Sequence, residues 1–140
     1  MPRSAPVGSV VLDTNIVLDL LVFDDPARAP LEAALQAGGL CWLATADMRG
    51  ELARVLGYPL IANRLASQGR EASEVLAAFD ARCRMVDGTP MRAPCVCSDP
   101  DDQMFIDLAV AHRARLLSKD RAVLSMRKRL AALGVEVDRA

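Results

Sequence analysis

Short apolar runs alternate along this chain with longer segments in which apolar residues recur every three or four positions. The short runs predict strands and the longer segments predict helices. The expected strands are Ser9–Asp13, Leu40–Ala44, Leu116–Ser118 and Val135–Val137. The expected helices are Thr14–Phe23, Pro30–Ala37, Ala46–Leu56, Leu60–Gln68, Glu71–Arg84, Pro100–Ala114 and Arg121–Leu133. Strands that alternate with helices imply parallel pairing, so we expect a three-layer α/β/α sandwich around a short parallel sheet.

One segment does not fit this alternation. Residues Met85 to Cys97 contain Gly88, Pro90 and Pro94, so we expect an irregular connection with a short extended piece near Val96. No repeat or linker divides the chain, and 140 residues suit a single domain spanning 1–140, with residues 1–8 as a loose N-terminus.

Composition narrows the function classes. The formal net charge is −1, so nucleic-acid binding would need a local basic patch, and 4% aromatic residues argue against base stacking as the main binding mode. The longest apolar stretch, Ile16 to Phe23, is too short to span a bilayer, and the first residues lack a signal peptide's apolar region. We therefore expect a cytoplasmic protein without a membrane partner, whose four cysteines are reduced thiols.

Four acidic residues carry the candidate chemistry. Asp13 and Asp120 follow apolar runs, whereas Glu51 and Asp102 fall in the opening turns of two helices. Strand ends and the following helix starts meet at one edge of a parallel sheet. Carboxylates gathered there repel one another unless a cation lies between them, and Mg²⁺ or Mn²⁺ prefers such oxygen ligands. This pattern indicates metal-assisted hydrolysis of phosphodiester bonds, with Asp13, Asp102 and Asp120 as metal ligands.

Each acid also has a structural explanation. Asp13, Asp99 and Asp120 can cap the helices that follow them. Pro100 marks the first helical position after Asp99, so Asp102 lies in the first turn, where the helix dipole favours an acid. Glu51 lies beside the apolar stripe of its helix and could instead pair with Arg54.

Position on the helix separates the remaining acids of the 99–107 segment. Asp102 heads the apolar stripe of its helix and is aimed at the sheet edge, whereas Asp107 lies opposite the stripe, as expected of a solvated charge. Small polar residues at the same edge would support the acids: Thr14, Asn15, Asp99 and Ser118.

Two further features suggest partners. Basic residues Arg113, Arg115, Lys119 and Arg121 flank Asp120, and they are either a rim that follows phosphates or solvated helix faces. The apolar residues Leu18, Leu21, Val22 and Phe23 exceed what one small core requires, which suggests a buried contact with another protein.

Taken together, the segments Val10–Asn15, Glu51-Leu52, Asp99–Ala109 and Leu116–Asp120 make the chain resemble PIN-domain proteins over nearly its full length. It is most similar to the branch of toxins from type II toxin–antitoxin modules. The resemblance implies a Mg²⁺- or Mn²⁺-dependent nuclease with RNA as substrate, and it also implies homodimers and a cognate antitoxin. It matches Asp13, Glu51, Asp102 and Asp120 to the family's acidic quartet, and Asn15 and Ser118 to its supporting positions.

Two other functions remain open. An aspartyl-phosphate phosphatase would use Asp13 as nucleophile, but that chemistry typically has a second Asp two residues later, where this chain has Asn15. A catalytically silent PIN-like fold that binds RNA or protein is the other, and retention of all four acids favours the nuclease over it.

Overall fold

A parallel five-stranded sheet forms the centre of the molecule. The computed structural model describes residues 8–139, so of the expected loose N-terminus only Gly8 is described, and Gly8 begins the first strand. The strand order is β3-β2-β1-β4-β5, and every pair is parallel. The strands are β1 (Gly8–Leu12), β2 (Leu40–Ala44), β3 (Arg84–Met85), β4 (Arg115–Leu117) and β5 (Val137–Asp138). The predicted α/β fold with a parallel sheet is confirmed.

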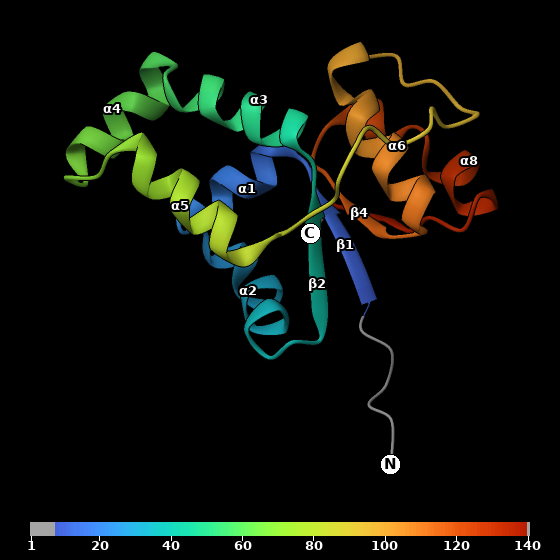
Figure 1. Ribbon diagram of the computed structural model, residues 1–140, viewed down its shortest axis with the longest axis horizontal. Coiled ribbons are helices and arrows are strands. Elements are labelled where there is room, and N and C mark those ends of the chain that lie inside the picture. Colours follow the sequence, from blue (N-terminus) through green and yellow to red (C-terminus); the bar gives the residue numbers. More distant parts are fainter. Residues whose placement is uncertain (1–7, 140) are drawn as a thin grey trace.

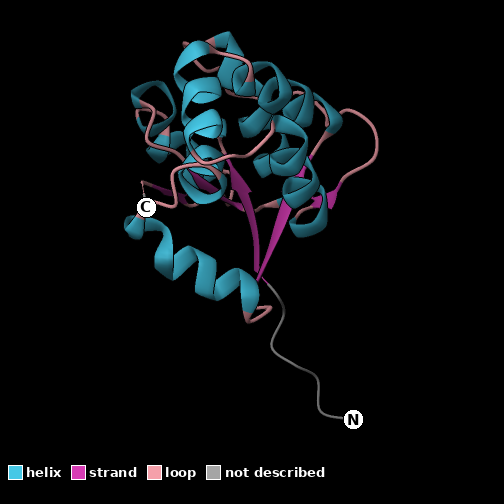
Figure 2. Ribbon diagram, turned by 90° about the vertical axis from the view of Figure 1, so that its left-hand side faces the viewer, coloured by secondary structure: helices cyan, strands magenta, loops and turns pink. Residues whose placement is uncertain are grey.

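Helices cover both faces of this sheet. The five N-terminal helices lie on one side of β1 and β2, and α6 and α8 lie on the other (Figure 1). The larger layer contains α1 (Thr14–Leu21), α2 (Ala29–Gln36), α3 (Ala46–Leu56), α4 (Pro59–Ser67) and α5 (Ala72–Arg82). The second layer contains α6 (Gln103–His112), α7 (Arg121–Leu124) and α8 (Arg127–Ala132). Figure 2 views the molecule from the side of the larger layer, whose helices lie in front of the strands.

The two layers follow from the direction in which the chain crosses the sheet. From β1 the chain proceeds outward to β2 and β3, then returns to β4 on the other side of β1 and continues to β5. Right-handed crossovers in opposite directions place their helices on opposite faces. The change of direction leaves a crevice at the carboxyl ends of β1 and β4, the usual position for ligands in such sheets. Asp13 and Ser118 directly follow these two strand ends.

The apolar residues that suggested a partner are used within this chain. Leu18, Leu21 and Val22 are buried in the core, and Phe23 is half-buried beneath the Arg64 guanidinium, 5.7 Å from the ring centroid. The surplus therefore does not indicate an exposed contact surface, because α3 and α5 pack against α1. None of the described helices is both long enough and apolar enough to cross a membrane.

Several element boundaries differ from the prediction. The third strand is β3 at Arg84–Met85, at the end of a segment predicted as helix, and Val96 is 60% exposed in a loop without strand pairing. A strand of two residues carries no detectable apolar pattern. The predicted Arg121–Leu133 helix is divided at Met126, which is buried in the core. Its amide donates to the Val123 carbonyl three residues back, where an α-helix would use the carbonyl four residues back. Short 3-10 turns, Pro26–Arg28 and Pro100–Asp102, precede α2 and α6.

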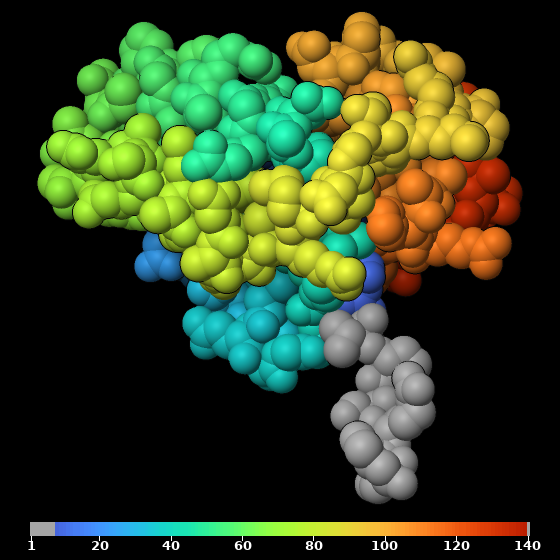
Figure 3. Space-filling view, in the orientation of Figure 1, coloured from blue at the N-terminus to red at the C-terminus, as the bar shows by residue number. Residues whose placement is uncertain are grey.

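The connection from α5 to α6 passes between the two helical layers on the face shown in Figure 3, and two side chains of α6 hold it. Gln103 accepts a bond from the Cys97 amide (2.6 Å) and donates to the Cys95 carbonyl (3.1 Å). Asp107 accepts from the Ala93 amide (2.9 Å) and from Gln103 (2.8 Å). Asp107 is therefore a half-buried loop anchor, and its prediction as a solvated charge is wrong.

Candidate metal centre

The carboxyl edge of the sheet opens into a cleft of about 320 Å³. Six predicted site residues line it: Asp13, Thr14, Asn15, Glu51, Asp102 and Asp120. They come from the ends of β1 and β4, the first turn of α1, the second turn of α3 and the 3-10 turn that precedes α6. The structure thus brings together all four acids that the sequence singles out.

Asp13 is both a helix cap and a wall of this cleft. Its side chain is only 3% exposed, its Oδ1 accepts from the Ile16 amide at 3.0 Å, and its Oδ2 accepts from the Ser118 hydroxyl. Burial raises the pKa of Asp13, the bonds from Ser118 and Ile16 oppose that rise, and the charge of Asp120 adds to it. Asp13 therefore caps α1 and also lines the cleft, so the structural and the functional interpretation are compatible.

Ser118 joins two of the acids. Its hydroxyl is fully buried, donates to Asp13, and accepts from the Asp120 amide at 3.0 Å. Asp120 in turn caps α7, because its Oδ1 accepts from the Ala122 amide at 2.8 Å. The end of β4 is therefore fixed relative to the end of β1 by side-chain bonds as well as by the sheet.

Glu51 is held by Thr14. The Thr14 hydroxyl donates to Glu51 Oε2, which ties α3 to the start of α1 across the cleft. Among the described residues Glu51 forms no ion pair with Arg54, which is exposed. The alternative explanation of Glu51 as a salt-bridge partner is thus not supported.

Three carboxylates form the tightest acidic cluster. Asp99, Asp102 and Asp120 each offer one oxygen, and these oxygens lie within 4.8 Å of one another. Asp102 Oδ2 is buried and receives no donor from any residue of 8–139. The pKa of Asp102 is raised to about 7, first by burial and then by the charges of Asp120 and Asp99. An unpartnered buried oxygen among close carboxylates fits a divalent cation, which prefers several oxygen ligands.

Asp99 was predicted as a supporting residue, but in the structure it is one of the three members of this cluster. It caps the 3-10 turn through the Asp101 amide (3.0 Å), and it contributes an oxygen alongside Asp102 and Asp120. Asp13 lines the same cleft but is outside that trio, and both of its oxygens already accept hydrogen bonds.

The predicted basic rim is divided by β4. Arg115 begins β4 and Arg113 precedes it, so both lie at the opposite edge of the sheet from Asp120. Arg115 also pairs with Asp138 at 2.5 Å. The structure therefore does not bring these two residues to the cleft. Only Lys119 and Arg121 adjoin Asp120 in the chain.

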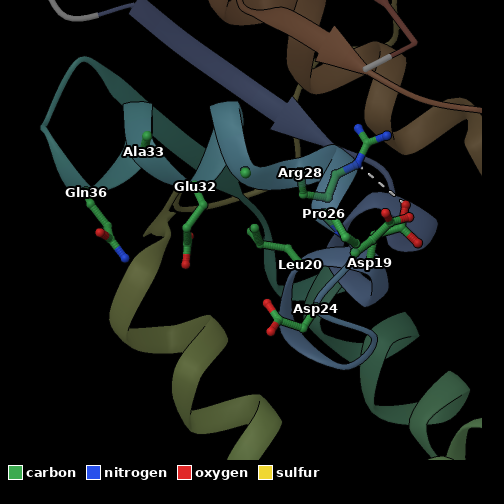
Figure 4. Close-up of a pocket in the computed structure, with 10 residues that line it drawn as sticks. Asp19, Leu20, Asp24, Pro26, Arg28, Glu32, Ala33 and Gln36 are labelled. Atoms are coloured by element: carbon green, nitrogen blue, oxygen red, sulfur yellow. Dashed lines mark ion pairs between the residues drawn. The ribbon is translucent and has the colours of Figure 1, made fainter.

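Lys119 belongs to a separate charge cluster around Asp19 of α1. Its ammonium bonds Asp19 at 2.6 Å, and the buried Arg28 approaches the same carboxylate at 3.7 Å (Figure 4). Asp19, which the sequence shows only as a polar break in an apolar helix, is thus a buried acid neutralised by two cations.

The sequence also missed the apolar part of the cleft. Beyond the acids, it is lined by Leu18, Val55, Tyr58, Leu60, Ile61 and Phe105. Val55 lies one helical turn after Glu51, a spacing that could have placed it beside that acid.

A family model for the PIN domain matches residues 9–122, which is more than half of the chain. The chain belongs to the PIN domain family. No curated protein matches it. Among solved structures, this PIN domain is similar to a chain of the crystal structure of VapBC2 from Rickettsia felis bound to a DNA fragment from their promoter. The TM-score is 0.59 at 15% identity, over 92% of this chain and 98% of that one, which supports the fold and leaves the activity to be argued from the site.

Proposed function

We propose that this PIN-domain protein is a divalent-metal-dependent endoribonuclease that hydrolyses RNA phosphodiester bonds. The observation that carries the proposal is Asp102, whose buried Oδ2 receives no hydrogen bond from residues 8–139 and which forms a tight cluster with two further carboxylates. Such a group destabilises the folded chain unless a cation joins it. PIN-domain membership supports a nuclease, and the presence of Asp13 and Glu51 in the same cleft supports catalysis rather than a structural ion.

Asp99, Asp102 and Asp120 would hold Mg²⁺ or Mn²⁺, with Asp13 at the adjoining wall. When bound, the ion supplies positive charge that lowers the pKa of a water molecule and neutralises charge that builds up on the phosphate. Ser118 and the Ile16 amide hold the Asp13 carboxylate in place, so that its orientation does not change as substrate arrives.

Glu51 is the residue we assign to the attacking water. Its carboxylate lines the cleft and is oriented by the Thr14 hydroxyl, so it can accept the proton that the water loses. The water oxygen then bonds to phosphorus, the bond from phosphorus to one ribose oxygen breaks, and that oxygen takes up a proton. Asn15, exposed at the mouth of the cleft, is placed to donate to a phosphate oxygen.

The biological setting of the proposal is a type II toxin–antitoxin module in the cytoplasm. Its support is the structural similarity to a chain of the VapBC2 complex, together with four free cysteines among the described residues. A cognate antitoxin would be the protein partner, and self-association into a homodimer is a further expectation.

The direct test is cleavage of single-stranded RNA by metal-stripped protein with Mg²⁺ or Mn²⁺ restored. Wild type should cleave, and Asp102→Asn should lose about 10³-fold in rate, roughly 4 kcal/mol of transition-state stabilisation. Asp101→Asn is the matched control, because it makes the same change at an exposed neighbour outside the tight cluster.

The alternatives give different results in the same assay. RNA binding without metal-dependent cleavage would indicate a silent binding module. Equal rates for wild type and Asp102→Asn would overturn the assignment of the site.

A further inference from the structure

The acidic cleft continues into an apolar wall that the proposed cleavage chemistry does not use. The wall is built by the end of α3 and the start of α4, with Val55, Tyr58 and Leu60 in sequence along it. Tyr58 is 51% exposed and Leu60 is 75% exposed. Exposed apolar groups that share a cleft with charged groups are typical of a binding site.

Tyr58 differs from every other aromatic residue of the chain. Trp42, Phe79 and Phe105 are buried in the core and Phe23 is half-buried, whereas the Tyr58 ring is open to solvent in the cleft. The low aromatic content argued against stacking along an extended surface. It does not argue against one stacking position, and the single exposed ring lies beside the acids.

Local backbone geometry presents this ring. Pro59 follows Tyr58 and restricts it to extended backbone, at φ −67° and ψ 142°. The Tyr58 amide is bonded to the Val55 carbonyl at 2.9 Å, which fixes the corner between the two helices. From Glu51 to Tyr58 the chain advances roughly 10 Å, at 1.5 Å per helical residue. The ring is therefore near the acids but not among them.

The hollow on the other side of Glu51 has a different character. It is lined by the acids Asp47 and Asp101 together with Arg54, Pro100 and Met104, and it contains no aromatic residue. A nucleotide has an anionic phosphate and a flat apolar base. The side with Tyr58 fits the base, and the side with Asp47 and Asp101 repels phosphate unless cations are added.

We propose that Tyr58, flanked by Val55 and Leu60, is a stacking subsite for the base of a nucleotide adjacent to the scissile phosphate. This proposal rests on the ribonuclease function proposed above and adds how the substrate is held. Stacking on an aromatic ring is tolerant of base identity, because every base has a π-face. The subsite would thus position single-stranded RNA without imposing a strict sequence.

The test is a double-mutant cycle between the ring and the bases. Two probes are compared: a short single-stranded RNA, and the same ribose-phosphate chain with reduced abasic positions in place of all bases. With Mn²⁺ present, kcat/KM is measured on both for wild type, Tyr58→Ala, Tyr58→Phe and Met91→Ala. Met91 is an exposed apolar residue outside the cleft and is the control.

Wild type should prefer the RNA with bases by about tenfold, the scale of one aromatic stack. Tyr58→Ala should reduce this ratio close to one, whereas Tyr58→Phe and Met91→Ala should keep it. Because Tyr58→Phe retains the ring, it separates loss of stacking from loss of folding.

Two results overturn the subsite. Cleavage with an unchanged base preference in Tyr58→Ala would show that the ring does not stack. An unchanged preference with loss of a dimer, measured by light scattering, would assign this face to self-association instead. Absence of any cleavage by wild type is a different failure, since it removes the ribonuclease proposal and the subsite with it.

Discussion

Asp19 is buried and Asp102 is half-buried, and the charges that surround the two carboxylates are opposite. Asp19 lies on α1 between the Lys119 ammonium at 2.6 Å and the buried Arg28. Asp102 lies just before α6 in a cluster with the carboxylates of Asp99 and Asp120, and its Oδ2 has no hydrogen-bond partner within residues 8–139.

Under the proposed function, the contrast separates an acid with a structural role from an acid that binds metal. A buried carboxylate is tolerated when cations within the same chain neutralise it, and removing one partner then leaves an uncompensated charge. A carboxylate surrounded by other carboxylates is repelled by their charges in the metal-free protein. A bound cation offsets this repulsion. The charges around the two carboxylates, and not their burial, make this distinction.

The largest expected effect is on the free energy of unfolding of the metal-free protein when Asp19 is replaced. Asp19→Asn should lower the free energy of unfolding by about 3 kcal/mol, because Arg28 and Lys119 lose their shared counter-charge. Denaturant melts at neutral pH measure it. A loss below half of this value would mean that the Asp19 cluster is not a structural ion pair.

Metal binding should stabilise the protein by a comparable amount. At a concentration 100 times the dissociation constant, Mn²⁺ should add about 2.7 kcal/mol, which raises the melting temperature by several degrees. Asp102→Asn should lose this shift and Asp19→Asn should keep it. Equal shifts in wild type and Asp102→Asn would place the ion elsewhere.

The pH dependence of metal-free stability should show a smaller effect. The pKa of Asp102 is about 7 in the folded protein, above its ordinary value near 4, so the folded state binds more protons between these values. Its contribution to stability is full below about pH 4 and is lost as pH rises to about 7.

Asp102→Asn removes this loss. It should therefore be more stable than wild type at pH 7 by about 1 kcal/mol, since solvent screening limits the effect at a partly exposed group, and equal to it near pH 4. Chemical denaturation at several pH values with a chelator present checks this. A difference that does not change with pH would contradict the assignment.

RNA affinity should show the smallest effect. Arg121→Ala should reduce the slope of log affinity against log salt by about 0.7, the value for one phosphate contact on a single strand. Replacing Arg113 and Arg115 together should leave that slope unchanged, because they lie at the other end of β4. A flatter slope in the double variant would show that RNA reaches that edge.

The sequence predicted the sheet class and the gathering of the acids because both depend on short-range rules. An apolar run followed by Asp13 fixes a strand end, and parallel strands end at one edge. It could not predict the pairing of Asp19 with Lys119, about 100 residues later in the chain, because charge pairing across the fold leaves no periodic pattern. Arg113 and Arg115 were grouped with Asp120 because they are close to it in the sequence. In the structure β4 separates them, since they lie at its start and Asp120 follows its end.

Tyr58 was missed for a related reason. In the sequence it is part of a Gly57-Tyr58-Pro59 helix break, and only the packing of α3 and α4 against the acidic edge shows that its ring lines the cleft.

The most direct measurement is calorimetric titration of Mn²⁺ into metal-stripped wild type, Asp102→Asn and Asp101→Asn at neutral pH. Saturable binding should occur in wild type and Asp101→Asn and be abolished in Asp102→Asn. No binding to wild type, or undiminished binding to Asp102→Asn, would contradict a metal centre at the acidic edge of the sheet.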